Sequence, residues 1–255
     1  MNAPLLITGS SGTIGTRLAT DLAARGIPLR LLDQWPPIHL PPAGAEFVQA
    51  DLRDKGTVDK AVAGAGAVIH LAGITEEAPF AEVVEHNITA THLLLEAARR
   101  HNVPRVVLAS SHHVTGVHPI GATAETLAPA PDSFYAVSKI TLEALGYLYA
   151  HKTGMEVVAV RIGSHRTHPT EPRHQATWIS PRDTTALLHA AATRPLPDRF
   201  LTVYGTSGND ETWWPRTGWD ALGYQPADNA AHHPETGPLT DRWTGGAFAD
   251  QDLPT

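Results

Sequence analysis

The sequence contains no cysteine, and it lacks other features that mark well-defined protein classes. Without thiols the chain has no disulfides, no thiolate nucleophile and no cysteine-ligated zinc site. No apolar run approaches the roughly 20 residues that a membrane-spanning helix needs. No basic segment followed by a long apolar core marks a signal peptide near Met1. We therefore expect a cytoplasmic protein without a membrane partner.

Basic residues are scarce as well. Lys and Arg number 19 against 26 Asp and Glu, which gives a formal net charge of -7. No run of Lys and Arg builds the basic face of a nucleic-acid binder, so we expect no nucleic-acid partner. The acidic balance also repels anions at long range, so an acidic substrate would need a local positive group. The 15 histidines show no His-Glu-x-x-His pattern, and we predict no metal site.

What the chain does contain is a regular alternation of short apolar runs with helical patterns. The expected strands are 5–7, 29–32, 46–49, 68–71, 106–109 and 157–160. The expected helices cover about 14–25, 55–63, 80–101 and 135–151. Near-continuous apolar strands separated by helices predict a parallel sheet that is covered on both faces. Right-handed crossovers make this α/β fold doubly wound, of the Rossmann type.

The pattern weakens after residue 163. A further helix around 182–193 and a strand around 200–204 are expected, and the tail beyond 229 is polar and rich in Gly and Pro. No linker or internal repeat divides the chain. We therefore predict a single domain over 1–255, with a Rossmann-type core over 1–163. Residues 164–255 are expected to form mainly a small lobe and a C-terminal tail.

A glycine-rich turn joins the first expected strand to the first expected helix. Its residues are Gly9, Gly12, Thr13, Ile14 and Gly15. Glycines let backbone N–H groups approach a pyrophosphate closely, and a helix N-terminus adds the positive end of a dipole. Three glycines also make an ordinary tight turn, but their place at the first strand–helix junction favours a dinucleotide site.

An acidic residue follows the second expected strand, where a dinucleotide site needs one. Asp33 lies 18 residues after Gly15. A carboxylate at that place accepts hydrogen bonds from the adenosine ribose and would repel a 2′-phosphate, which favours NAD over NADP. Alone, Asp33 would be an ordinary loop aspartate; its distance from the glycine turn favours the functional interpretation.

A tyrosine and a lysine four residues apart, Tyr135 and Lys139, fall on one face of the expected helix 135–151. An ammonium about 4 Å from a phenol attracts the phenolate by roughly 4 kcal/mol at an effective dielectric constant of about 20. This attraction would lower the tyrosine pKa by about three, before the cost of burial is subtracted. Tyr135 would then serve as a base near neutral pH, although a single Tyr-x-x-x-Lys pair also occurs in ordinary cores. Ser110 and Ser111 end the preceding strand.

Together these residues resemble the extended short-chain dehydrogenases over roughly residues 4–165. The resemblance implies that NAD is the cofactor of the core and that Ser111, Tyr135 and Lys139 are catalytic. Ser111 is favoured over Ser110 because it lies five residues before Gly116, the spacing found in that family. The further cofactor contacts that the resemblance implies are Asp51, Leu52, Leu71, Ala72, Gly73, Asn87, Ser110, Tyr135, Lys139 and Ile162.

Other segments are similar to those of uronate dehydrogenases over nearly the whole chain. They are Ser-Ser-His-His at 110–113, Val-Arg-Ile-Gly-Ser at 160–164, Asn209-Asp210 with Trp213-Trp214, Gly-Tyr-Gln-Pro at 223–226 and Gly-Gly-Ala-Phe at 245–248. The likeness implies oxidation of a free hexuronic acid, glucuronate or galacturonate, at the anomeric carbon to an aldarolactone. It also implies a homo-oligomer that assembles through the long helices.

The implied substrate contacts are Thr75, Ser111, His112, His113, Ser164, Arg173 and Phe248. A guanidinium at Arg173 can bind the carboxylate with two parallel hydrogen bonds; without the resemblance it would be a solvated loop arginine. Phe248 is expected to cover the pocket, in its own subunit or a neighbour's. Three residues depart from the family: His112 replaces an Asn, Thr75 replaces a Ser, and His165 stands where small residues are usual. His112 could narrow the sugar preference or change the pH profile.

Two other functions share parts of this pattern. A nucleotide-sugar epimerase or dehydratase has the same glycine turn and Tyr/Lys pair but keeps its NAD and releases no NADH. Such enzymes carry a larger C-terminal lobe than the roughly 90 residues after Gly163 provide. A redox sensor that binds NAD without catalysis is the other alternative, and such proteins often lose the Tyr/Lys pair.

Overall fold

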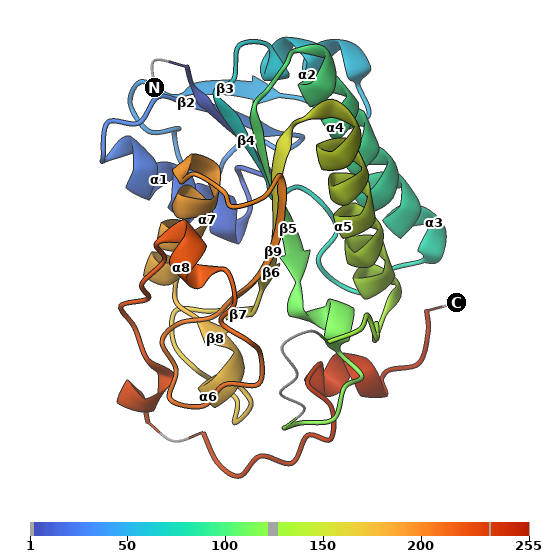
Figure 1. The fold of residues 1–255 in the computed structure, drawn as a ribbon, viewed down its shortest axis with the longest axis vertical. Helices are drawn as coiled ribbons and strands as arrows, with labels where there is room; N and C mark the ends of the chain where they lie inside the picture. The colour runs from blue at the N-terminus through green and yellow to red at the C-terminus, as the bar shows by residue number, and fades with distance from the viewer. Residues whose placement is uncertain (1–2, 122–126, 235, 255) are drawn as a thin grey trace.

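The computed structural model describes residues 3–121, 127–234 and 236–254, and it confirms the predicted doubly wound parallel sheet (Figure 1). Seven strands lie in the order β3-β2-β1-β4-β5-β6-β9, and every neighbouring pair is parallel. The strands are β1 (Leu5–Thr8), β2 (Leu29–Asp33), β3 (Glu46–Gln49), β4 (Ala67–His70), β5 (Arg105–Ser111), β6 (Glu156–Ile162) and β9 (Phe200–Gly205). The order reverses at β1, which opens a crevice at the carboxyl ends of β1 and β4.

Helices cover both faces of this sheet (Figure 1). On one face lie α1 (Thr13–Ala23) and α7 (Pro181–Thr193), which contact each other. The other face carries α2 (Lys55–Val62), α4 (Ala90–Arg100) and α5 (Phe134–Thr153). Successive side chains of β1 point to opposite faces of the sheet. Leu5 and Ile7 pack with α1 and α7, while Leu6 packs with α2 and α4. A fully apolar strand is therefore required here, as the sequence pattern predicts.

One expected helix is divided in the structure. The segment predicted as a helix over 80–101 consists of α3 (Phe80–Val83), a π-helical stretch (Val84–Thr89) and α4. The π-helical stretch contains Asn87, whose side chain is buried and hydrogen-bonded to the loop after β4. Apolar periodicity alone does not reveal this local change of hydrogen bonding.

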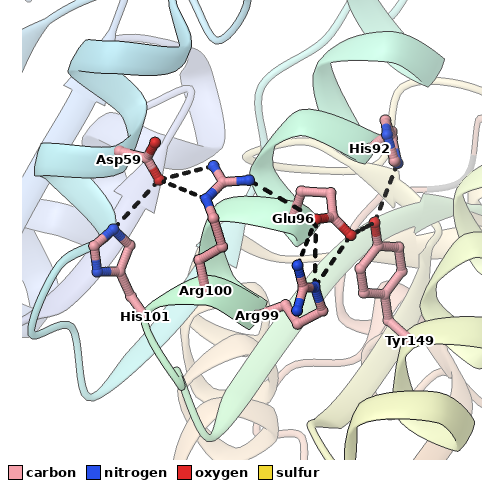
Figure 2. A network of polar contacts seen from close by, with 7 residues as sticks. All are labelled: Asp59, His92, Glu96, Arg99, Arg100, His101 and Tyr149. Atoms are coloured by element: carbon pink, nitrogen blue, oxygen red, sulfur yellow. Dashed lines mark hydrogen bonds and ion pairs between the residues drawn. The ribbon is translucent and has the colours of Figure 1, made fainter.

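A polar network on the outer side of α2, α4 and α5 ties these helices together (Figure 2). Tyr149 of α5 donates a hydrogen bond to Oε1 of Glu96 on α4, at 2.5 Å. Glu96 also accepts from Arg99, whose guanidinium holds the pKa of Glu96 below its ordinary value. Arg100 of α4 bridges to Asp59 of α2 at 2.8 Å. The network fixes α5, and α5 carries the Tyr/Lys pair of the site.

The segment after β6 contributes to both the core and a small lobe. Helix α7 and strand β9 belong to the main sheet and its cover, so the core extends past the expected boundary at 163, while the rest lies mainly beyond the carboxyl edge. The lobe contains β7 (Ser164–His165), α6 (His174–Thr177), β8 (Trp178–Ile179), α8 (Trp219–Leu222) and two 3₁₀ turns (Ala230–His232 and Gly246–Asp250). β7 and β8 pair in parallel as a separate two-stranded sheet that the sequence pattern did not predict. The C-terminal segment returns to the core, where Gly245 N–H donates to the Gly116 carbonyl at 2.8 Å. Within the described residues, no helix combines the length and the apolar character needed to cross a bilayer.

Candidate active site

A cleft of about 1020 Å³ runs along the carboxyl ends of the strands. Its lining begins at the glycine turn after β1, passes the ends of β2 to β6, and reaches the C-terminal 3₁₀ turn that carries Phe248. The structure thus brings together segments from both ends of the chain in one continuous site. All the sequence-predicted site residues line this cleft except Asn87.

The glycine turn at one end of the cleft is shaped by close backbone contacts. Gly9 has φ of +71°, and a Cβ there would lie 2.6 Å from the Ala72 backbone nitrogen. A Cβ on Gly15 would lie 2.2 Å from the Gly9 carbonyl oxygen. Helix α1 follows at once, and in the described chain no side chain caps its first N–H groups. Free N–H groups at the positive end of a helix dipole fit the pyrophosphate of a dinucleotide.

Asp33 stands beside this turn at the end of β2. Its Oδ2 accepts from the Ser11 N–H at 2.9 Å, and its Oδ1 accepts from the Trp35 N–H at 3.0 Å. Each carboxylate oxygen keeps a second lone pair for a ribose hydroxyl. Asp51 lies farther along the same cleft, and its hydrogen bonds with Arg53 hold its pKa below the ordinary value. The arrangement fits the adenosine half of NAD.

Helix α5 presents Tyr135 and Lys139 to the middle of the cleft. Its N-terminus is capped by Ser133, whose hydroxyl accepts from the Ala136 N–H at 3.1 Å. Glu77, from the loop after β4, accepts from the Phe134 and Tyr135 N–H groups. These contacts explain why the first turn of α5 is held in place.

The expectation that Lys139 lowers the pKa of Tyr135 is wrong for the protein alone. Burial raises the pKa of Tyr135 to about 12, although a hydrogen bond with Ser111 acts in the opposite direction. Burial also lowers the pKa of Lys139 to about 8. The ammonium donates to the Ala109 carbonyl at 2.8 Å and lies 5.4 Å from the centre of the Tyr135 ring. Desolvation of the phenolate is therefore the main influence on the pKa of Tyr135, and the nearby Asp132 carboxylate raises it further.

The two serines at the end of β5 have different surroundings. The Ser110 hydroxyl donates to Glu143 at 2.6 Å, and Glu143 also pairs with Arg161. Ser111 lies on the Tyr135 side, where its Oγ accepts from the His113 N–H at 3.2 Å. Ser110 lines the cleft, but its hydroxyl is already engaged. The geometry agrees with the choice of Ser111 as the serine beside the tyrosine.

His113 forms a buried pair with Asp132, a residue that the sequence analysis missed. Nδ1 of His113 lies 2.6 Å from Oδ2 of Asp132, whose side chain is fully buried. Gly116 and Gly245 pack so closely that a Cβ on either would lie within 2.0 Å of this carboxylate oxygen. A carboxylate can only accept, so Nδ1 of His113 carries the proton and Nε2 is left as the second ring nitrogen. The only sequence signal was the Asp-Ser pair just before the helix that carries Tyr135.

His112, which departs from the resembled family, packs between aromatic groups. Its ring lies 4.2 Å from that of His113 and 5.0 Å from that of Trp214. Burial, helped by the charges of His113 and Arg173, holds the pKa of His112 well below its ordinary value. His112 is therefore neutral around neutral pH, and the expectation that it shapes the pH profile there is not supported. Its Nδ1 is buried and has no hydrogen-bond partner within the described chain.

At the far end of the cleft, Arg173 contacts the C-terminal segment that carries Phe248. Nη1 of Arg173 donates to the Gly245 carbonyl at 3.0 Å, and its Nε donates to Glu171 at 2.9 Å. The Phe248 ring lies 4.6 Å from the His113 ring in the same chain, so a neighbouring subunit is not needed to bring it here. Ser164 also lines the cleft and shares a hydrogen bond with Thr177 at 2.8 Å. Thr75 lines the cleft from the loop after β4.

The predicted cofactor contact at Asn87 needs correction. Its amide accepts from the Ile74 N–H at 2.7 Å and donates to the Ile74 carbonyl and to the Ser138 hydroxyl. Its side chain therefore joins the loop after β4 to α5 and does not line the cleft in the described structure. The lining residues that sequence reasoning missed include Ser11, Trp35, Ile38, Glu76, His86 and Arg166. Except for His86 in the π-helical stretch, they lie in loops, where residue spacing carries little information.

Comparison with known proteins shows the same pattern along the chain. Residues 5–198 match the model of the NAD dependent epimerase/dehydratase family. A uronate dehydrogenase from Agrobacterium fabrum is 39% identical, covering 98% of this chain and 97% of its own. A crystal structure of a mutant uronate dehydrogenase from Agrobacterium tumefaciens, complexed with NAD, has a TM-score of 0.89 at 36% identity and covers 98% of both chains. A glucuronic acid dehydrogenase structure from Chromohalobacter salexigens has a TM-score of 0.89 at 32% identity, covering 100% of this chain and 99% of that one.

Proposed function

Because the chain belongs to the NAD dependent epimerase/dehydratase family, we propose that it oxidises a free hexuronic acid, glucuronate or galacturonate, with NAD. The observation that carries the proposal is one cleft that holds the glycine turn, Tyr135 and Arg173 together. The sugar would be oxidised at its anomeric carbon and released as an aldarolactone. The uronate dehydrogenases and the glucuronic acid dehydrogenase described above support this substrate class.

The residues around Tyr135 account for the proton transfer. Ser111 and Tyr135 bind the anomeric hydroxyl, and the Tyr135 phenolate takes its proton while the hydrogen on the same carbon leaves as hydride. Bound NAD supplies the hydride acceptor. Lys139, held by the Ala109 carbonyl, keeps an ammonium near the phenolate. His113, fixed by Asp132, presents its second ring nitrogen to a sugar hydroxyl.

The positive group that an acidic sugar needs is Arg173. Its side chain is 12% exposed and lies at the end of the cleft beside Phe248, in a chain whose net charge is -7. Replacing Arg173 with Met should lower kcat/KM for a uronate by roughly 100-fold, since hydrogen bonds to charged groups contribute about 1.5–3 kcal/mol each. Arg166 also lines the cleft, so Arg166→Met is the matched control and should have a much smaller effect. Equal losses in the two variants would contradict the role of Arg173.

The decisive experiment is a screen for NADH release, followed by absorbance at the nicotinamide band. Purified protein with NAD should release NADH with glucuronate or galacturonate, and little with neutral aldoses or nucleotide sugars. Folded, NAD-binding protein that gives no NADH with either uronate would refute the proposal. Conversion of a nucleotide sugar without net NADH would instead indicate an epimerase or dehydratase.

We also infer a homo-oligomer in the cytoplasm. The outer face of α5 leaves Val137 and Leu148 37% and 49% exposed. These residues are eleven positions apart, which places them on one side of the helix. Contact with a second copy would remove both side chains from water. The cytoplasmic location is part of the same proposal, because the reaction depends on a supply of NAD.

A further inference from the structure

Large exposed apolar side chains gather in the loop between β2 and β3. Trp35 is 68% exposed, Ile38 89% and Leu40 94%. Trp35 and Ile38 line the cleft beside Asp33, while Leu40 is not among the described lining residues. An indole offers one of the largest apolar surfaces of any side chain, and leaving it in water forgoes that burial. Trp35 therefore lies at the rim of the cleft, where a bound ligand would cover its exposed ring.

The backbone of Trp35 is held firmly although its ring is exposed. The Trp35 N–H donates to Asp33 Oδ1 at 3.0 Å, and the Trp35 carbonyl accepts from the Ser11 hydroxyl at 2.8 Å. The preceding carbonyl, of Gln34, accepts from the Gln49 side chain at 3.1 Å. Pro36 and Pro37 follow and restrict the backbone further. The backbone that carries the indole is thus anchored to the glycine turn through Ser11 and to Asp33, the residue that fits the ribose.

The chemistry of this end of the cleft points to a flat, uncharged ring. Leu52 and Ala50 line it together with Trp35 and Ile38, and the carboxylates of Asp33 and Asp51 lie in the same region of the cleft. An anionic occupant would be repelled by these carboxylates. A nucleobase has an apolar face for an indole, and stacking of a base on an aromatic side chain adds considerably to binding.

We propose that Trp35, supported by Ile38, covers the adenine ring of bound NAD and contributes a large part of the cofactor affinity. Trp35 acts on the half of the cofactor that does not react. The inference depends on NAD binding and not on the choice of sugar, so it stands or fails separately from the proposed substrate.

The test compares ligands that contain or lack the adenine. Trp35→Ala should weaken the binding of NADH and of ADP-ribose by roughly 5- to 100-fold, the range expected for loss of one base–aromatic stack. Binding of the reduced nicotinamide mononucleotide, which has no adenine, should change less than about 2-fold by the same principle. Trp35→Phe keeps an aromatic ring and should retain most of the affinity. Leu40→Ala, an exposed residue of the same loop, is the control and should bind all three ligands like the wild type.

Tryptophan fluorescence supplies a second readout that is independent of catalysis. ADP-ribose should quench part of the wild-type emission, and that part should be missing in Trp35→Phe. Equal weakening of NADH and of the mononucleotide in Trp35→Ala, or unchanged ADP-ribose affinity, would overturn the proposal. A thermal melt of each variant checks folding. If Trp35→Ala does not fold, the difference in quenching between the wild type and Trp35→Phe decides the proposal.

Discussion

At the scale of single residues, the chemistry of the site depends on burial more than on charge pairs. Tyr135 and Lys139 are both buried, so the phenol holds its proton more tightly and the ammonium holds its proton less tightly than in water. A base must be deprotonated to work. With a tyrosine pKa of about 12 and a lysine pKa of about 8, the fraction of phenolate keeps increasing as the pH rises through neutrality.

We therefore expect kcat/KM for a uronate to rise between about pH 6 and about pH 8, since the phenolate fraction grows toward the raised pKa of Tyr135 while Lys139, with a pKa of about 8, still carries its proton. Tyr135→Phe should lose at least ~100-fold in rate over this range because it removes the proton acceptor. Initial rates measured at constant ionic strength test both statements. A flat profile over this range, or an active Tyr135→Phe protein, would rule out the phenolate base.

Asp132 is the residue whose role is least visible in the sequence. Asp132→Asn keeps the shape of the buried side chain but removes the charge that fixes His113. The KM for the uronate should rise about 10-fold, the usual effect of losing a hydrogen bond to a charged group, while NADH affinity stays unchanged. In a double-mutant cycle, Asp132→Asn should add little to His113→Ala, because Asp132 acts through that ring. Additive losses would show that Asp132 acts independently of His113.

At the scale of elements, the small lobe is joined to the sheet through the first turn of α7. Asp183 is 1% exposed and accepts from the Ser207 hydroxyl at 2.6 Å and from the Ala227 and Asp228 N–H groups at 2.8 and 3.1 Å. Ser180 caps the same helix. One buried carboxylate thus connects α7 to the segment after β9 and to the chain before the last 3₁₀ turns.

Asp183→Ala should lower the free energy of unfolding by about 2–3 kcal/mol, because it leaves the buried Ser207 hydroxyl and two partly buried N–H groups without their acceptor. Urea denaturation followed by circular dichroism measures this change. Asp198→Ala replaces an exposed aspartate and should stay within about 0.5 kcal/mol of the wild type. If both variants unfold at the same urea concentration, the carboxylate of Asp183 does not hold the lobe in place.

At the scale of the whole molecule, α4 and α5 form the outer layer on one side of the sheet (Figure 1). The polar network of Figure 2 holds these helices to each other on one part of this surface. Val137 and Leu148 are exposed on α5. A surface with apolar positions beside fixed charges suits contact with an identical copy.

The double variant Val137→Lys with Leu148→Lys should therefore shift an oligomer toward single chains, because it places charges in the apolar contact. Sedimentation velocity over a range of concentrations measures the shift. Leu239→Lys changes another exposed leucine, outside α5, and should leave the assembly as it is. A wild-type protein that sediments as a single chain would contradict the proposed homo-oligomer.

Local pattern was sufficient for most of the fold. Apolar runs such as 106–109 and the glycine turn at 9–15 are short-range features, and the strands and main helices lie within a few residues of their expected bounds. The pair β7 and β8 escaped prediction because two-residue strands carry no periodicity. The π-helical stretch also escaped prediction, because it contains Asn87, whose side chain accepts a hydrogen bond from Ile74 in a distant loop, a contact that periodicity does not show.

For this protein, the sequence by itself determined the class of sheet, the order of its elements and the residue types that chemistry of this kind requires, since these depend on neighbours along the chain. Only the tertiary structure decided which groups meet. It placed Asp132 under His113 and brought Phe248 back across the cleft from the far end of the chain. It also set the protonation of Tyr135, because the cost of desolvating a phenolate depends on everything packed around it.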